Sequence, residues 1–186
     1  LSYLRFARSA SAPLSPEIHR RFEERFNIPI IETMGLTETG SQITTNPMPP
    51  AIRKIGSPGT AFGNEIMIAD DTLAAVPTGT IGEILVRGAN VMQGYLNQPE
   101  ETAKTISPDG WLRTGDLGYL DQDGYVFVSG RIKELIIKGG ENIAPREIDE
   151  ALLEHEAVLE AAAFAVPCEN YGERVEACIR LKEQVH

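Results

Sequence analysis

Residues 110–142 read GWLRTGDLGYLDQDGYVFVSGRIKELIIKGGEN and combine two strand-like runs, a tight acidic turn and a glycine pair. Asp116 stands at the end of GWLRTGD, and Arg131 stands just after the second run. The turn DQDG at residues 121–124 joins the two runs and predicts a hairpin. Such a hairpin would return Arg131 to the neighbourhood of Asp116.

Asp116 follows Gly115, so its carboxylate can be presented without a bulky neighbouring side chain. A carboxylate can accept two hydrogen bonds from a vicinal diol, and a ribose carries such a diol. The alternative is an ordinary turn residue. A calcium loop starting at Asp121 is excluded, because its twelfth position requires a glutamate and Ile132 stands there.

The stretch MGLTETG, residues 34–40, is a second candidate site, and it follows a buried-strand pattern at residues 28–33. Threonine hydroxyls and exposed amides beside glycines suit phosphate oxygens, and Glu38 could hold a magnesium ion that bridges phosphates. The alternative is a polar helix cap with Thr37 as N-cap. Residues 34–47 are expected to form a loop at the carboxyl end of the strand, where function commonly resides.

The glycine pair of KGGEN, residues 138–142, is a third candidate. It lacks the spacing of a P-loop, and the chain contains no G-x-G-x-x-G. Two glycines permit the close passage of a slender ligand or a moving backbone, whereas the alternative is a plain left-handed turn.

Hydrophobic periodicity outlines the rest of the fold. Ser15 as N-cap, Pro16 at the first turn and an apolar face of Ile18, Phe22 and Phe26 predict a helix at residues 15–26. His19, in the run HRR, is expected to face solvent. From residue 57 to 125, short runs alternate with turns and predict small antiparallel sheets or an open barrel, interrupted by a short helix at residues 99–106.

The pattern changes again after Arg131 and predicts a small separate lobe. Its expected order is strand, helix, strand, strand, at residues 134–139, 145–155, 158–166 and 174–181. The fold class is therefore mixed α/β and α+β.

Composition narrows the functional classes. The chain has 186 residues, of which 42% are hydrophobic, enough for a globular core. Its 17 basic and 27 acidic residues give a net charge of -10, which disfavours nucleic acid and anionic membrane surfaces. Cys168 and Cys178 predict free thiols in a reducing compartment, and no signal peptide or apolar run of ~20 residues is visible, so we expect a cytoplasmic protein. The three histidines show no metal-ligand spacing, and no Ser-His-Asp arrangement is visible.

Taken in order, the stretches SASAPLSPE, ETMGLTE, GWLRTGD, GYVFVSGRIKELIIKGGENIAPREIDE and AAAFAVP resemble the adenylate-forming superfamily, specifically its acyl-CoA synthetases. The resemblance runs from Ser9 to at least Val185. It implies that residues 1–131 are the end of a large AMP-binding lobe, with an α/β piece at 1–56 and a β-barrel-like subdomain at 57–131. Residues 132–186 would then be part of a small α+β lobe.

The resemblance also implies an activity. In this family a carboxylic acid attacks the α-phosphate of ATP, pyrophosphate leaves, and coenzyme A captures the acyl-adenylate. The small lobe rotates between these two half-reactions. The implied partners are ATP or AMP, magnesium, coenzyme A and a small carboxylic acid whose identity stays open, as does the oligomeric state.

Individual roles follow from the same resemblance. The adenine and acyl pocket would use Ser11, Ala12 and Pro13, although the family's S-G-A-A-P has Ala10 and Ser11 in its second and third places here. Met34 stands where an aromatic ring usually stacks on adenine, a departure that weakens any argument from ring stacking. The remaining roles are the phosphate motif Gly35, Leu36 and Thr37, the magnesium ligand Glu38, the ribose ligands Asp116 and Arg131, the hinge Lys133, and the coenzyme A channel at Gly139, Gly140 and Glu141.

Two segments of the family pattern are not found in the chain. The phosphate loop is expected before Leu1 and the adenylation lysine after His186, because the chain resembles a piece of a longer protein. We therefore expect little adenylation by these 186 residues alone. The alternatives are an adenylation domain that loads a carrier protein and a non-catalytic nucleotide-binding fragment.

Overall fold

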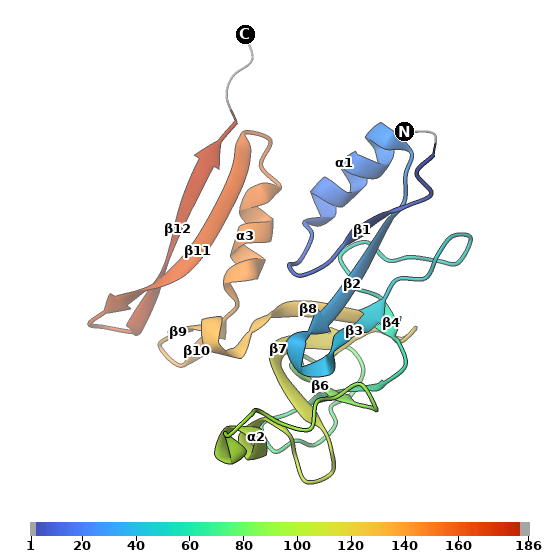
Figure 1. Ribbon diagram of the computed structural model, residues 1–186. Helices are drawn as coiled ribbons and strands as arrows, with labels where there is room; N and C mark the ends of the chain where they lie inside the picture. The colour runs from blue at the N-terminus through green and yellow to red at the C-terminus, as the bar shows by residue number, and fades with distance from the viewer. Residues whose placement is uncertain (1–2, 183–186) are drawn as a thin grey trace. The chain divides into compact units, whose positions relative to one another are not determined.

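The computed structural model describes residues 3–182 and divides into two compact units, Leu1–Val128 and Ser129–His186 (Figure 1). The assignment of residues 1–131 and 132–186 to two lobes, with a subdivision after residue 56, stays a prediction. Val185 and His186, which the sequence interpretation included, lie outside the described residues.

The first unit begins with a β-α-β crossover. Strand β1 (Ala7–Ser9) is parallel to β2 (Ile30–Leu36), and helix α1 (Pro16–Phe26) connects them. Strands β3 (Ser41–Thr45) and β4 (Thr60–Ala61) extend this sheet in antiparallel pairings, in the order β1-β2-β3-β4. The helix begins at Pro16 as predicted, but the Ser15 side chain makes no capping hydrogen bond.

The predicted loop at residues 34–47 is wrong. Strand β2 continues to Leu36, a short 3₁₀ helix η1 (Thr37–Thr39) makes the turn, and β3 follows at once. Hydroxyl-rich sequence suggested a loop, yet β-branched threonine also fits a pleated strand, and Thr44 is fully buried there.

The second sheet contains β5 (Glu65–Ala69), β6 (Gly82–Arg87), β7 (Leu112–Leu120) and β8 (Val126–Arg131) in the order β5-β6-β7-β8. The residues of β8 from Ser129 onward are assigned to the second unit. The core of this sheet packs Ile68, Ile84 and Val126 together. Helix α2 (Pro99–Thr105) precedes β7, close to its predicted position. The turn at residues 121–124 is confirmed, because the Asp121 carboxylate accepts the backbone N–H groups of Asp123 and Tyr125 at 2.9 Å each.

Two segments far apart in the sequence are tied together in the first unit. Residues 52–57 and 121–126 share an ion pair between Lys54 and Asp121, and Lys54 also lies 4.7 Å from the centre of the Tyr125 ring. The Ser57 hydroxyl donates to the Val126 carbonyl at 2.5 Å, and Val126 forms an isolated bridge with Gly59. These contacts connect the first sheet to β8, the last strand of the second sheet.

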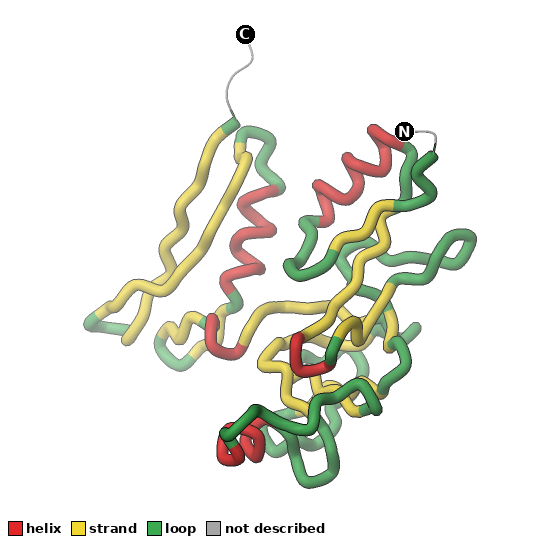
Figure 2. The backbone as a smooth tube through the Cα atoms, viewed as in Figure 1, coloured by secondary structure: helices red, strands yellow, loops and turns green. Residues whose placement is uncertain are grey.

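The second unit has more strands than predicted. After the 3₁₀ helix η2 (Ile132–Glu134), β9 (Ile136–Lys138) and β10 (Glu141–Ile143) form a hairpin that the sequence interpretation missed. Helix α3 (Pro145–Leu153) then lies along β11 (Val158–Cys168), which pairs with β12 (Gly172–Leu181) (Figures 1 and 2). The sheet order is β10-β9-β12-β11. Strand β10 has only three residues, too few to show an alternating pattern.

The mixed α/β architecture is confirmed. Within residues 3–182, none of the helices combines the length and the apolar character that a membrane-spanning helix requires.

Candidate nucleotide-binding site

The turn at the end of β2 is built around the buried hydroxyl of Thr39. This oxygen accepts the Leu36 N–H at 3.2 Å and lies 3.0 Å from the Leu36 carbonyl and 2.9 Å from that of Ser41. Leu36 is the N-cap residue, so the alternative in which Thr37 caps a helix is wrong. Thr37 is instead exposed at the first position of the turn.

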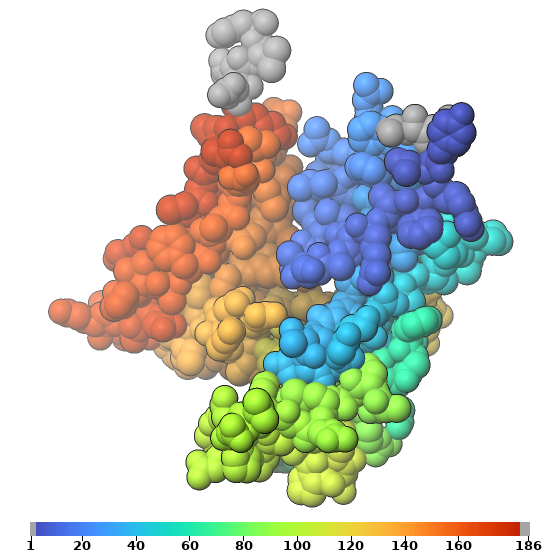
Figure 3. All heavy atoms as spheres, in the orientation of Figure 1, coloured from blue at the N-terminus to red at the C-terminus, as the bar shows by residue number. Residues whose placement is uncertain are grey.

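Glu38, in the same turn, is held from a distant part of the chain. The Tyr95 hydroxyl donates to its Oε1 at 2.8 Å, and the Met92 N–H donates to its backbone carbonyl at 2.7 Å. Figure 3 shows the light-blue residues near position 40 directly beside the green segment that follows Arg87. The hydrogen bond to Glu38 raises the pKa of Tyr95 above its ordinary value, because the carboxylate stabilises the protonated phenol that donates to it.

Glu38 fits the magnesium role by its chemistry. It is a partly exposed carboxylate, and magnesium prefers hard oxygen ligands. Residues 3–182 contain no cluster of three or more acidic, histidine or cysteine ligands. A site completed by substrate phosphates needs only one or two carboxylates, so Glu38 alone is compatible with it.

The predicted adenine-contacting residues lie near the same strand. Met34 is half-buried and packs against the Ile68, Ile84 and Val126 core. Ser11, exposed in the segment with Ala12 and Pro13, has a φ of 74° in the left-handed region, which non-glycine residues rarely adopt. Strained backbone of this kind is concentrated at ligand sites. The adenine contacts of these residues remain a prediction.

Asp116 lies in an irregular part of β7 and is only 5% exposed. Its N–H donates to the Thr114 hydroxyl at 3.0 Å, and that hydroxyl donates to the Ile84 carbonyl at 2.8 Å. Arg131 belongs to the second unit, and the convergence of these two side chains on one ribose stays a prediction.

Glu83 was missed by the sequence interpretation. It is 6% exposed, and its Oε1 accepts the Gly115 N–H at 3.0 Å while its Oε2 accepts Arg113 Nε at 2.8 Å. In sequence it is one carboxylate within the strand-like run GEILVRG, 32 positions before Gly115. Only the strand pairing reveals its connection to the TGD turn.

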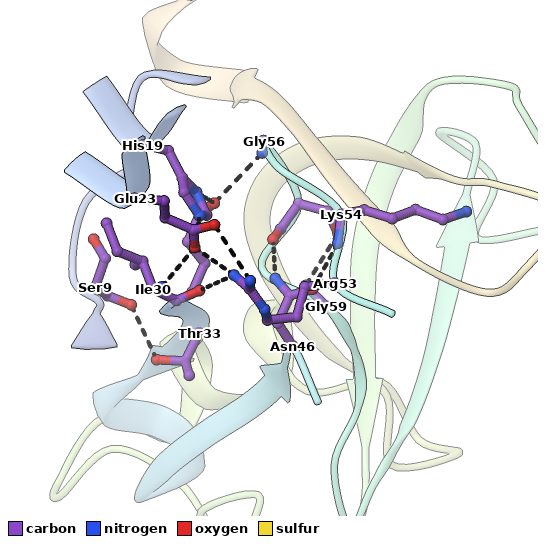
Figure 4. A network of polar contacts seen from close by, with 12 residues as sticks. Ser9, His19, Glu23, Ile30, Thr33, Asn46, Arg53, Lys54, Gly56 and Gly59 are labelled. Atoms are coloured by element: carbon purple, nitrogen blue, oxygen red, sulfur yellow. Dashed lines mark hydrogen bonds and ion pairs between the residues drawn. The ribbon is translucent and has the colours of Figure 1, made fainter. Parts of the chain in front are cut away.

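His19 is buried, contrary to the predicted solvent-facing position. It is 1% exposed, and its ring nitrogens lie 2.8 Å from Glu32 and 2.9 Å from Glu23 (Figure 4). Two carboxylate partners require two ring N–H donors and therefore a protonated imidazole. Burial lowers the pKa of His19, but the hydrogen bonds and charges of Glu32 and Glu23 outweigh it and raise the pKa overall.

Arg53 completes this network and fixes helix α1 to β2. Its guanidinium donates to the Ile30 carbonyl at 3.0 Å and pairs with Glu23, which also accepts the Ile30 N–H at 2.7 Å (Figure 4). Partial burial would raise the pKa of Glu23, but Arg53, Ile30 and His19 together lower it to about 2. The helix face presented to β2 is thus ionic, whereas Ile18 and Phe26 of the predicted apolar face are largely exposed.

The remaining predicted residues lie in the second unit. Lys133 is in the middle of η2. Gly139 and Gly140 have φ values of 60° and 92° and form the two-residue turn between β9 and β10, with Glu141 beginning β10. The left-handed-turn alternative is therefore correct as geometry, while the hinge and coenzyme A roles stay predictions.

Comparison with known proteins agrees with this arrangement. Residues 1–96 match the model of the family "AMP-binding enzyme", and residues 147–186 match "AMP-binding enzyme C-terminal domain". A sulfoacetate–CoA ligase of Cupriavidus necator is 54% identical over 97% of this chain and 35% of its own length. An oxalate–CoA ligase of Saccharomyces cerevisiae is 42% identical over 97% of the chain and 34% of its own length.

Solved structures show the same relationship. ATP-bound MatB from Rhodopseudomonas palustris has a TM-score of 0.94 at 36% identity, with 99% of this chain and 37% of that chain covered. The anthranilate CoA ligase AuaEII, in complex with anthranoyl-AMP, has a TM-score of 0.88 at 32% identity, with 99% of this chain and 35% of that chain covered. The chain spans about a third of the length of these relatives. On this evidence, the chain belongs to the AMP-binding enzyme family.

Proposed function

We propose that the full-length protein is an ATP-dependent carboxylic acid:CoA ligase. The observation that carries the proposal is the construction of two polar turns in one compact unit, each in the family's motif order: residues 35–38 at the end of β2, and Asp116 in β7. Relatives with 42% and 54% identity are named CoA ligases, which supports thioester formation as the second step.

The proposed first half-reaction joins the acid to the nucleotide. A carboxylate oxygen attacks the α-phosphorus of ATP, the bond to the bridging oxygen breaks, and pyrophosphate leaves. In this proposal Thr37 donates its hydroxyl to phosphate oxygen, while Ser11, Ala12, Pro13 and Met34 contact the adenine and acyl moieties. Asp116 accepts both ribose hydroxyls, and Arg131 assists there.

Glu38 would hold magnesium, which supplies charge neutralisation of the phosphates when bound. Tyr95 donates to one carboxylate oxygen of Glu38 and thereby restricts its orientation. This arrangement matches the general pattern in which a metal-binding carboxylate is itself hydrogen-bonded.

The second half-reaction forms the thioester. The sulfur of coenzyme A attacks the acyl carbonyl carbon, and AMP leaves. Lys133 would absorb the backbone rotation between the two steps, and Gly139, Gly140 and Glu141 would border the pantetheine passage. Two adjacent positive-φ glycines without Cβ atoms suit such a close approach.

The first acids to test are short ones with a second anionic group. Sulfoacetate and oxalate, the acids named for the two relatives described above, share this property. The proposal is tested by measuring acid-dependent release of pyrophosphate and formation of the CoA thioester by the full-length protein. Transfer to a carrier protein but not to coenzyme A would contradict it.

The ribose role of Asp116 gives a direct mutational test. Asp116→Ala in the full-length enzyme should raise the KM for ATP by roughly tenfold or more, because charge-assisted hydrogen bonds to the diol are lost. Asp71→Ala, which removes an exposed turn carboxylate of the same unit, is the control and should leave that KM unchanged. An unaltered KM in Asp116→Ala would remove the ribose assignment.

The 186 residues alone are expected to show little adenylation, because they cover only about a third of the related enzymes. Pyrophosphate release by the isolated chain at the rate of the full-length enzyme would contradict this expectation.

A further inference from the structure

The TGD turn is a bulge in β7. Glu83 of β6 is opposite Leu117, and Leu85 is opposite Arg113, with an irregularity between the two pairs. Two steps along β6 therefore correspond to four along β7, so residues 114–116 together face Ile84. Bulges interrupt the ladder, re-aim side chains and leave backbone groups without ladder partners.

Side chains satisfy the backbone of this bulge. The Gly115 N–H donates to Glu83 Oε1 at 3.0 Å, and the Asp116 N–H donates to the Thr114 hydroxyl at 3.0 Å. The same hydroxyl donates to the Ile84 carbonyl at 2.8 Å. Gly115 has a φ of 72°, and a Cβ there would meet nothing within 4 Å, so the backbone conformation and not space favours glycine.

The Glu83 carboxylate contacts protein groups and is shielded from solvent. It is buried, and its second oxygen is neutralised by Arg113, with Nε at 2.8 Å and Nη2 at 2.7 Å. A buried carboxylate requires such partners, since an unpaired one would be strongly destabilising. One carboxylate thus fixes the residues on both sides of Thr114.

We propose that Glu83 is a positioning residue that holds the bulge at residues 114–116 and thereby sets the direction of the Asp116 carboxylate toward the two hydroxyls of the nucleotide's ribose. The proposal rests on the proposed ribose role of Asp116. Glu83 does not touch the nucleotide in this scheme, and its effect passes through Gly115.

The test is Glu83→Gln in the full-length enzyme, assayed with ATP and with 2′-deoxy-ATP. The glutamine places an NH₂ group or an uncharged oxygen against the donors Arg113 and Gly115, so one contact is lost. We expect the KM for ATP to rise roughly tenfold with a much smaller change in kcat. We also expect the preference for ATP over 2′-deoxy-ATP to shrink, because a displaced Asp116 gains less from the 2′-hydroxyl.

Glu65→Gln is the matched control. Glu65 also lies in this sheet and also forms a two-pronged pair with an arginine, Arg87, at 3.0 and 2.7 Å, but it does not contact the bulge. Its replacement should leave the ATP preference unchanged. If Glu83→Gln does not fold, Thr114→Val tests the same bulge through the hydroxyl and should reduce the preference in the same way.

A double variant separates this proposal from the proposed function. Adding Glu83→Gln to Asp116→Ala should cause no further rise in the KM for ATP, because the carboxylate that it positions is gone. Additive effects, or a lower Tm with an unchanged ATP preference, would overturn the positioning role while leaving the ribose role intact. If Asp116→Ala itself leaves the KM unchanged, the ribose role fails and the positioning proposal fails with it.

Discussion

At the scale of single residues, Glu38 shows how a proposed metal ligand can be oriented by a partner that lies far away in the sequence. Tyr95 is 57 positions later and donates to Glu38 Oε1 at 2.8 Å. Tyr95 is itself fixed, since its N–H donates to the Thr102 hydroxyl at 2.9 Å. The orientation of Glu38 therefore depends on a segment outside the TETG motif.

Removing this hydroxyl should weaken the proposed magnesium site. In the full-length enzyme, Tyr95→Phe should raise the magnesium concentration needed for half-maximal adenylation by roughly tenfold, the usual scale for loss of a partner that orients a metal ligand. Magnesium titrations, followed both by rate and by calorimetry with ATP, measure this. Tyr3→Phe, at a fully exposed tyrosine, is the control. Equal magnesium dependence in wild type and Tyr95→Phe would exclude the orienting role.

Sequence could predict the motif residues but not their partners. Composition and order suggested Glu38 and Asp116 as candidates, because carboxylates beside glycines and hydroxyls are visible in the chain. Tyr95 and Glu83 carry no such local pattern. Their relevance comes from tertiary contacts and strand register, which depend on the packing of the whole unit.

At the scale of elements, the position of α1 on β2 depends on ionic contacts. His19 and Glu23 of the helix contact Glu32 and Ile30 of the strand, and Arg53 joins them from a loop. The same strand continues into the proposed phosphate motif. Protonation changes in this network should therefore affect the stability of the element that carries the motif.

The acid side of the stability profile should reflect Glu23. Its folded pKa of about 2 is below its usual 4.5, so its stabilising contribution is present above pH 4.5 and is lost as the pH falls toward 2. A shift of this size corresponds to on the order of 3 kcal/mol before solvent screening is discounted. Urea unfolding at a series of pH values between 5 and 2.5 measures this loss of stability.

Two comparisons make this prediction specific. Glu23→Gln should flatten the acid limb of the profile, and an unchanged slope in that variant would contradict the assignment. The raised pKa of His19 acts in the opposite direction, because its contribution is present below its usual 6.5 and is lost as the pH rises through the folded value. His19→Gln should flatten that alkaline decline and keep most of the acid limb, because Arg53 and the Ile30 N–H still lower the pKa of Glu23 in this variant.

The elements were predictable where their patterns were long. Helix α1 and helix α3 follow from proline starts and apolar spacing, and β11 and β12 from extended apolar runs. The short strands β1, β4 and β10 have two or three residues each and give no periodic signal. The ionic contacts between α1 and β2 could not be predicted either, because a histidine next to arginines is typical of a solvent-exposed helix face.

At the scale of the whole molecule, the chain consists of two compact units, and Lys133 lies near the start of the second. In the proposed function this unit turns between the two half-reactions, and the backbone torsions around Lys133 absorb the change. The mixed fold class was predictable from motif order and changes in pattern. The geometry of the proposed catalytic cycle was not, because that proposal requires one sequence to adopt two arrangements.

The hinge proposal predicts an unequal loss of the two half-reactions. Lys133→Pro restricts φ at this position and should slow thioester formation at least about tenfold more than adenylation, measured by separate single-turnover assays. Lys133→Ala retains backbone freedom and is the control, expected to preserve the ratio of the two rates. Equal slowing of both half-reactions by proline would argue against a hinge here.

The contacts between residues 52–57 and 121–126 have a consequence for biosynthesis. The hydrogen bond from the Ser57 hydroxyl can form only after Val126, 69 positions later, has been synthesised. The ion pair of Lys54 likewise requires Asp121, 67 positions later. During translation the first sheet therefore emerges from the ribosome well before the strand that secures it. Nascent chains that end before Val126 lack these contacts, so we expect the first unit to fold cooperatively after the DQDG hairpin has been synthesised.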